Sequence, residues 1–165
     1  MTTEERKAED ARFRQEYPLF AQYPELIYLD NAATTQKPSC VIQAESAFYE
    51  KYNANPFRGV YELAEFATEH YEEARAEVAK LLANADEIVF TRNASESLNL
   101  IAYSLGNLVL RPGDEVLVSI MEHHSNLLVW QQAAKRTGAT LRYLDCTQDG
   151  KITAEMVEAA ITDKT

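Results

Sequence analysis

The sequence has little of what disulfide-stabilised, metal-binding and membrane-spanning proteins need. Its two cysteines, Cys40 and Cys146, have no Cys/His metal spacing, so neither a disulfide framework nor a zinc site is predicted. Both are expected to be buried or idle thiols. No apolar run is long enough to cross a bilayer, and the polar residues 1–7 are not a signal peptide. A soluble, cytoplasmic protein is therefore expected.

Positive charge is also scarce. The chain has 16 lysines and arginines against 26 aspartates and glutamates, which gives a net charge of −10. Phosphate backbones repel such a chain, so nucleic-acid binding is not expected as its main activity. A length of 165 residues allows one domain with a core, or part of a larger domain.

The order of hydrophobic patterns predicts an α/β protein. The first half has a charged surface helix at residues 4–15, a short strand at 26–29, a helix after Pro38, a loop at 53–59 and a long helix at 60–83. Strands and helices then alternate: strands at 87–91, 115–120 and 140–144, helices at 95–105 and 126–136, and a last helix with Met156 and Ile161. Strands separated by helices through short connections indicate βαβ units and a parallel sheet.

Polar residues follow two of these predicted strands. Ser95 is a candidate N-cap, and free backbone amides at a helix start bind anions such as phosphate. His123 and His124 follow the strand at 115–120, where open α/β sheets bind ligands. An imidazole at that point can stack on a flat ring or move a proton. Because neighbouring parallel strands bring their loops together, a shared site is predicted.

Each candidate also has a purely structural interpretation. Ser95 taken alone is better explained as a helix cap, since its loop has no glycine-rich signature. A loop histidine could bond only to backbone, and a metal site would need a third ligand that is not evident nearby. Ala32 and Ala33 could let the backbone approach a ligand closely, or could form an ordinary connection. Arg58 could place a guanidinium near a carboxylate, but one loop arginine is a weak indication.

Several segments stand in an order that is typical of one family. They are Tyr28-Leu29-Asp30-Asn31-Ala32-Ala33-Thr34, Gln36-Lys37-Pro38, Tyr52-Asn53-Ala54-Asn55 with Arg58-Gly59-Val60, Phe90-Thr91-Arg92-Asn93-Ala94-Ser95-Glu96 with Asn99-Leu100, Gly113-Asp114-Glu115, and Met121-Glu122-His123-His124-Ser125-Asn126 with Trp130-Gln131. The ordered set resembles the Suf-type (group II) cysteine desulfurases of the class V aminotransferases. The likeness covers nearly everything from about residue 17 to residue 165.

This resemblance implies a fold and a reaction. The fold is that of pyridoxal-phosphate (PLP) enzymes of fold type I: an α/β/α three-layer domain with a mostly parallel sheet, here incomplete, after an N-terminal helical and extended segment. Residues 1–58 would belong to the small domain and a substrate-side loop, and residues 59–165 to the first half of the large PLP-binding domain. The reaction converts L-cysteine to L-alanine and leaves an enzyme persulfide for a sulfur-acceptor protein of iron–sulfur cluster assembly. A homodimer is implied for the full-length enzyme.

The resemblance also assigns roles to residues. Ala94 and Ser95 match the phosphate-cup positions, where backbone amides and a hydroxyl hold the PLP phosphate. His123 matches the histidine that stacks on the pyridine ring and protonates a substrate intermediate, while His124 keeps a structural interpretation. A substrate-side position is implied for the loop alanines and the loop arginine named above, residues 32, 33 and 58.

Three positions depart from the family pattern. Ser95 replaces the usual threonine, which keeps the hydroxyl and loses a methyl group. Phe57 and Tyr61 stand where histidines are common, so titratable groups are lost near the expected dimer-facing side of the site. These changes put substrate preference or sulfur relay in question.

The residues that complete PLP chemistry are expected downstream in this family. They are the lysine that anchors the cofactor, the aspartate that pairs with the pyridinium nitrogen and the cysteine that receives sulfur. Cys40 and Cys146 lie outside the family's cysteine motif. An N-terminal part that is inactive alone, with an exposed apolar sheet edge, is therefore expected. Two alternatives stay open: another class V enzyme, such as a selenocysteine lyase or epimerase, and a non-catalytic partner from a truncated or split gene.

Overall fold

The chain packs as two units that divide between Ile88 and Val89. A computed structural model describes residues 2–83 and 85–165. The predicted domain boundary, between residues 58 and 59, concerns the organisation of the larger fold and stays a prediction. Within the described residues, no helix is both long enough and apolar enough to span a bilayer.

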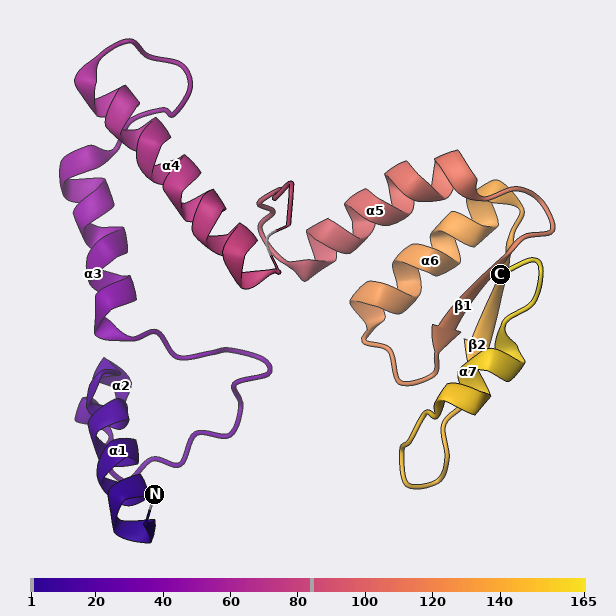
Figure 1. The fold of residues 1–165 in the computed structure, drawn as a ribbon, viewed down its shortest axis with the longest axis horizontal. Helices are drawn as coiled ribbons and strands as arrows, with labels where there is room; N and C mark the ends of the chain where they lie inside the picture. Colours follow the sequence, from indigo (N-terminus) through magenta and orange to yellow (C-terminus); the bar gives the residue numbers. More distant parts are fainter. Residues whose placement is uncertain (1, 84) are drawn as a thin grey trace. The chain divides into compact units, whose positions relative to one another are not determined.

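The first unit is helical (Figure 1). It contains α1 (Thr3–Gln15), α2 (Pro18–Gln22), α3 (Ser39–Ala47), the π-helix η1 (Phe48–Tyr52) and α4 (Glu62–Leu81). The predicted leader helix is confirmed as α1, which begins at a capping box in which the side chains of Thr2 and Glu5 bind each other's backbone N–H. The predicted long helix is confirmed as α4.

Two predicted strands, at residues 26–29 and 87–91, are wrong. Neither segment joins a β-ladder with any described residue, although strands exist only through hydrogen bonds to a neighbouring strand. Arginine side chains bind these segments instead. Arg14 donates from Nη2 to the carbonyl oxygens of Pro24 and Leu26, at 2.7 Å each, and Arg75 donates from Nη1 to the carbonyl of Ile88.

The second unit is an α/β unit with a short parallel sheet. It contains α5 (Ala94–Val109), β1 (Glu115–Ser119), α6 (His124–Thr137), β2 (Thr140–Leu144) and α7 (Ala154–Ala160). The strands pair in parallel, from Glu115 opposite Thr140 to Ser119 opposite Leu144, as predicted. In the βαβ unit, α6 connects the strands and packs on both of them, while α7 packs on β2. The predicted α/β class is confirmed: the unit is a partial α/β fold with a short parallel sheet.

Small side chains at their contact let α5 and α6 lie side by side (Figure 1). Ala133 is fully buried, Ala102 is 2% exposed, and a Cβ added to Gly106 would lie 3.5 Å from the Cβ of Ala133. Ala102 and Ala133 form a core with Val129, against which Leu98, Leu110 and Trp130 pack. The position of α5 on α6 therefore depends on the absence of bulk at this contact.

Residues that follow α7 bind back to the start of β1. The N–H of Glu115 donates to the carbonyl of Lys164 at 2.8 Å, and its carboxylate accepts from Thr162 Oγ1 and Arg142 Nη1, at 2.7 Å each. These hydrogen bonds, the Thr162 bond first and the Arg142 bond next, hold the pKa of Glu115 below its ordinary 4.5.

Replacing Ala133 by leucine should destabilise the second unit by about 1–3 kcal/mol, because the larger side chain cannot fit between α5 and α6. Urea denaturation followed by circular dichroism measures the change. Gln131→Leu, which places the same side chain on the exposed face of α6, is the control and should change stability much less. Equal effects of both substitutions would contradict the packing argument.

Glu115→Gln should lower stability most at neutral pH. A carboxylate whose pKa falls on folding contributes stability above its unfolded pKa, which is near 4.5, and that contribution is lost as pH falls through the folded value. The difference in unfolding free energy between wild type and variant should therefore shrink below pH 4.5. Denaturation at steps from about pH 7 to about pH 3 measures it, with the exposed Glu158→Gln as control. A difference that stays constant with pH would count against this role.

Candidate functional site

The second unit holds a cleft of about 390 Å³ at the starts of α5 and α6, a size within the range of small-molecule sites. Residues from both helices line it: Ser95 and Asn99 from α5, the cap residue His123, and His124, Ser125, Leu128, Val129 and Gln132 from α6. Polar groups are therefore concentrated where two helices begin.

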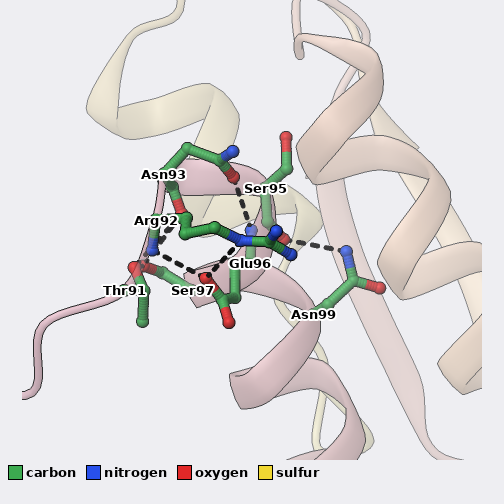
Figure 2. A network of polar contacts seen from close by, with 7 residues as sticks. All are labelled: Thr91, Arg92, Asn93, Ser95, Glu96, Ser97 and Asn99. Atoms are coloured by element: carbon green, nitrogen blue, oxygen red, sulfur yellow. Dashed lines mark hydrogen bonds and ion pairs between the residues drawn. The ribbon is translucent and has the colours of Figure 1, made fainter.

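Asn93, not Ser95 as predicted, is the N-cap of α5 (Figure 2). Its Oδ1 accepts from the N–H of Glu96 at 3.0 Å, and Glu96 Oε2 accepts from the N–H of Arg92 at 2.6 Å. Asn93 has the extended backbone of a cap residue, whereas Ser95 already lies in the first helical turn. The asparagine amide therefore takes the capping role.

This cap leaves donors available at the start of α5. Among the described residues, no group accepts from the N–H of Ala94, the N–H of Ser95 or the hydroxyl of Ser95. The Ser95 hydroxyl points away from the capping network in Figure 2, and Asn99 Nδ2 donates to the Ser95 carbonyl at 2.8 Å. Free amides and the positive end of the helix dipole favour an anion here, phosphate above all.

His123 is the N-cap of α6. Its Nδ1 accepts from the N–H of Ser125 at 3.1 Å and lies 2.8 Å from the Ser125 hydroxyl. A ring nitrogen that accepts a hydrogen bond carries no proton, so the neutral ring has its N–H at Nε2. The exposed imidazole can therefore offer an apolar face and one N–H donor to a ligand in the cleft.

Ser95 and His123 share this cleft, and Ala94 directly precedes Ser95. The sequence predicts that neighbouring strands bring the two loops together. The contact between α5 and α6 does so instead, since residues 87–91 form no strand. His124, interpreted from the sequence as an ordinary loop residue, is the first residue of α6 and also lines the cleft.

Besides His124, five lining residues were not among the predicted site residues: Asn99, Ser125, Leu128, Val129 and Gln132. Helical spacing is the signal that could have found them. Asn99 lies four residues after Ser95, and Leu128 and Gln132 continue the same spacing from His124. Such residues share a helix face, but only helix packing shows that both faces meet.

The other predicted site residues belong to the first unit. Ala32 and Ala33 lie in an exposed turn, in which the N–H groups of Ala33 and Thr34 donate to the Asp30 carbonyl at 3.2 and 3.0 Å. Arg58 is exposed in the loop before α4. The substrate-side role of these residues stays a prediction.

Phe57 has a structural role next to Arg58. It adopts a left-handed φ of 65°, and its N–H donates to Thr68 Oγ1 at 2.9 Å. Its ring contacts Tyr71 edge-on, with 5.5 Å between centroids. These contacts hold the loop against α4.

No cysteine lines the cleft, and no metal site is found in the part of the chain that the structure describes. Cys40 is exposed and Cys146 is half-buried, and neither lines the cleft. Within residues 2–83 and 85–165, no three His, Cys, Asp or Glu side chains are placed to hold a metal ion.

Comparisons with known proteins agree on one family. The family model for Aminotransferase class-V matches residues 27–165. A "Probable cysteine desulfurase" of Halalkalibacterium halodurans is 48% identical over 142 residues, which cover 85% of this chain and 35% of that protein. The chain therefore spans about a third of the length of the curated relatives that it matches.

Solved structures give the same match. The cysteine desulfurase of Thermococcus onnurineus NA1 has a TM-score of 0.80 and 41% identity, with 88% of this chain and 36% of that chain covered. The cysteine desulfurase CsdA of Escherichia coli has a TM-score of 0.79 and 36% identity, with 93% and 39% covered.

Inorganic phosphate should bind at the start of α5. In a ¹⁵N-labelled chain the amides of Ala94 and Ser95 should shift most during titration, and Ser95→Ala should weaken binding about three- to tenfold, the contribution of one hydrogen bond. Ser104→Ala, farther along α5, is the matched control. Shifts centred elsewhere, or equal losses in both variants, would refute the site.

Proposed function

Because this chain belongs to the class V aminotransferase family, we propose that it forms the N-terminal part of a PLP-dependent cysteine desulfurase. The names of its relatives support cysteine as the substrate. The observation that carries the proposal is the cleft lined by both Ser95, whose N–H and hydroxyl are free, and the cap residue His123.

The residues of the cleft fit PLP. The cofactor has an anionic phosphate and a flat pyridine ring. The amides of Ala94 and Ser95 and the Ser95 hydroxyl would hold the phosphate, aided by the α5 dipole. His123 would lie against the ring, since aromatic faces gain energy by stacking.

His123 would also handle a proton. PLP, when bound, supplies an electron sink for the reacting amino acid. With Nδ1 engaged by Ser125, Nε2 is the atom of His123 that can donate a proton to bound substrate. The cap thus selects which imidazole nitrogen takes part in catalysis.

The wider assignments follow from the same proposal. The complete enzyme would be Suf-type, would release L-alanine from L-cysteine, and would pass sulfur to an acceptor protein for iron–sulfur cluster assembly. It would act as a cytoplasmic homodimer. The lysine that anchors PLP and the cysteine that carries sulfur would come from outside the matched third of the enzyme.

A chimera tests the proposal. This chain replaces the matching N-terminal part of Escherichia coli CsdA, of which it covers 39%, and alanine released from L-cysteine is measured. The chimera should be active. His123→Phe should retain PLP but lose at least about 100-fold in alanine release, because the ring face remains while the proton donor is lost. His123→Ala should also bind PLP more weakly.

His70→Phe, at a histidine on α4 of the other unit, is the matched control and should keep full activity. A folded chimera that binds PLP but releases no alanine would overturn the desulfurase assignment. A chimera that does not bind PLP would overturn the cofactor assignment.

A further inference from the structure

Glu122 connects the end of β1 to the first turn of α6. Its Oε1 accepts from the hydroxyl of Ser119 at 2.9 Å, and its Oε2 accepts from Nδ2 of Asn126 at 2.8 Å. Ser119 Oγ also accepts from the N–H of Met121 at 3.2 Å. One carboxylate therefore fixes both ends of the connection that carries His123.

This network is anchored in the core. Oδ1 of Asn126 accepts from Nε1 of Trp130 at 3.0 Å, and Trp130 packs against the cluster of Ala102, Val129 and Ala133. Ser119, Glu122, Asn126 and Trp130 are all half-buried, whereas His123 is exposed. The connection is thus held in place by the half-buried residues that flank His123, while His123 itself remains exposed.

Glu122 keeps its charge at neutral pH. The hydrogen bond from Asn126 first, and that from Ser119 next, lower its pKa below the ordinary 4.5. Both carboxylate oxygens therefore accept hydrogen bonds, as this geometry requires.

We infer that Glu122 is a positioning residue: it holds the strand-to-helix connection so that His123 caps α6 through Nδ1 and keeps its proton at Nε2. A histidine is an unusual cap, since Ser, Thr, Asp and Asn are the preferred residues. The local sequence alone therefore gives little preference for this arrangement, and the Glu122 bridge supplies it. The importance of the tautomer for catalysis rests on the proposed function, but the tautomer itself does not.

NMR of the ¹⁵N-labelled chain without cofactor tests the inference, because the shifts of the two imidazole nitrogens report the tautomer of His123. Wild type should show the proton at Nε2. Glu122→Ala should reduce this preference at least about threefold, because both hydrogen bonds of the carboxylate are lost. Glu122→Gln should keep the wild-type shifts, because an amide can accept from Asn126 and donate to Ser119.

Glu158→Ala, at an exposed glutamate of α7, is the matched control and should leave the His123 shifts unchanged. Backbone shifts from Leu127 onward show whether α6 remains folded. If Glu122→Ala does not fold, Glu122→Asp decides, since its side chain is one methylene shorter and cannot reach both partners.

Wild-type His123 shifts in Glu122→Ala, or in Glu122→Asp where the alanine variant does not fold, would overturn the inference. The inference would also be overturned if Glu122→Gln reduced the preference for the Nε2 tautomer as much as Glu122→Ala. Failure of the chain to bind phosphate or PLP would instead count against the proposed function, because the NMR measurement uses neither.

Discussion

The close contact between α5 and α6 is the interaction on which the site depends. Ala102, Gly106 and Ala133 have little or no side chain, so the helices approach closely and their N-terminal ends form one cleft. A larger residue at this contact would separate Ser95 from His123 without changing either residue. Packing far from the chemistry thus sets the geometry of the chemistry.

The two helix starts complement each other. The Asn93 side chain accepts from the N–H of Glu96, and the Glu96 side chain accepts from the N–H of Arg92. The N–H groups of Ala94 and Ser95 therefore stay free for an anion. At α6 the cap is the proposed catalytic group itself, because His123 uses Nδ1 for the helix. Backbone donors at one terminus and a side-chain donor at the other can thus act on the two ends of one ligand.

Much of the second unit could be predicted from the sequence. Parallel strands at residues 115–119 and 140–144, and helices after them, follow from periodicity and turn residues. The failures have a common physical cause. A strand at 26–29 or 87–91 requires a partner strand, which a hydrophobic run cannot reveal. Asn93 is the N-cap of α5 in place of Ser95, because Asn93 has the extended backbone of a cap residue and Ser95 is already helical.

The sequence by itself determined the family, and its ordered segments single out Ser95 and His123 as the residues proposed to bind phosphate and move a proton. Only the tertiary structure decided how these residues act together. Caps and periodicity are properties of residues close in the chain, whereas the cleft joins helices whose starts are 30 residues apart, from Ala94 to His124. The role of the Glu122 bridge was also decided by the tertiary structure, because it depends on where β1 ends and on Trp130 in the core.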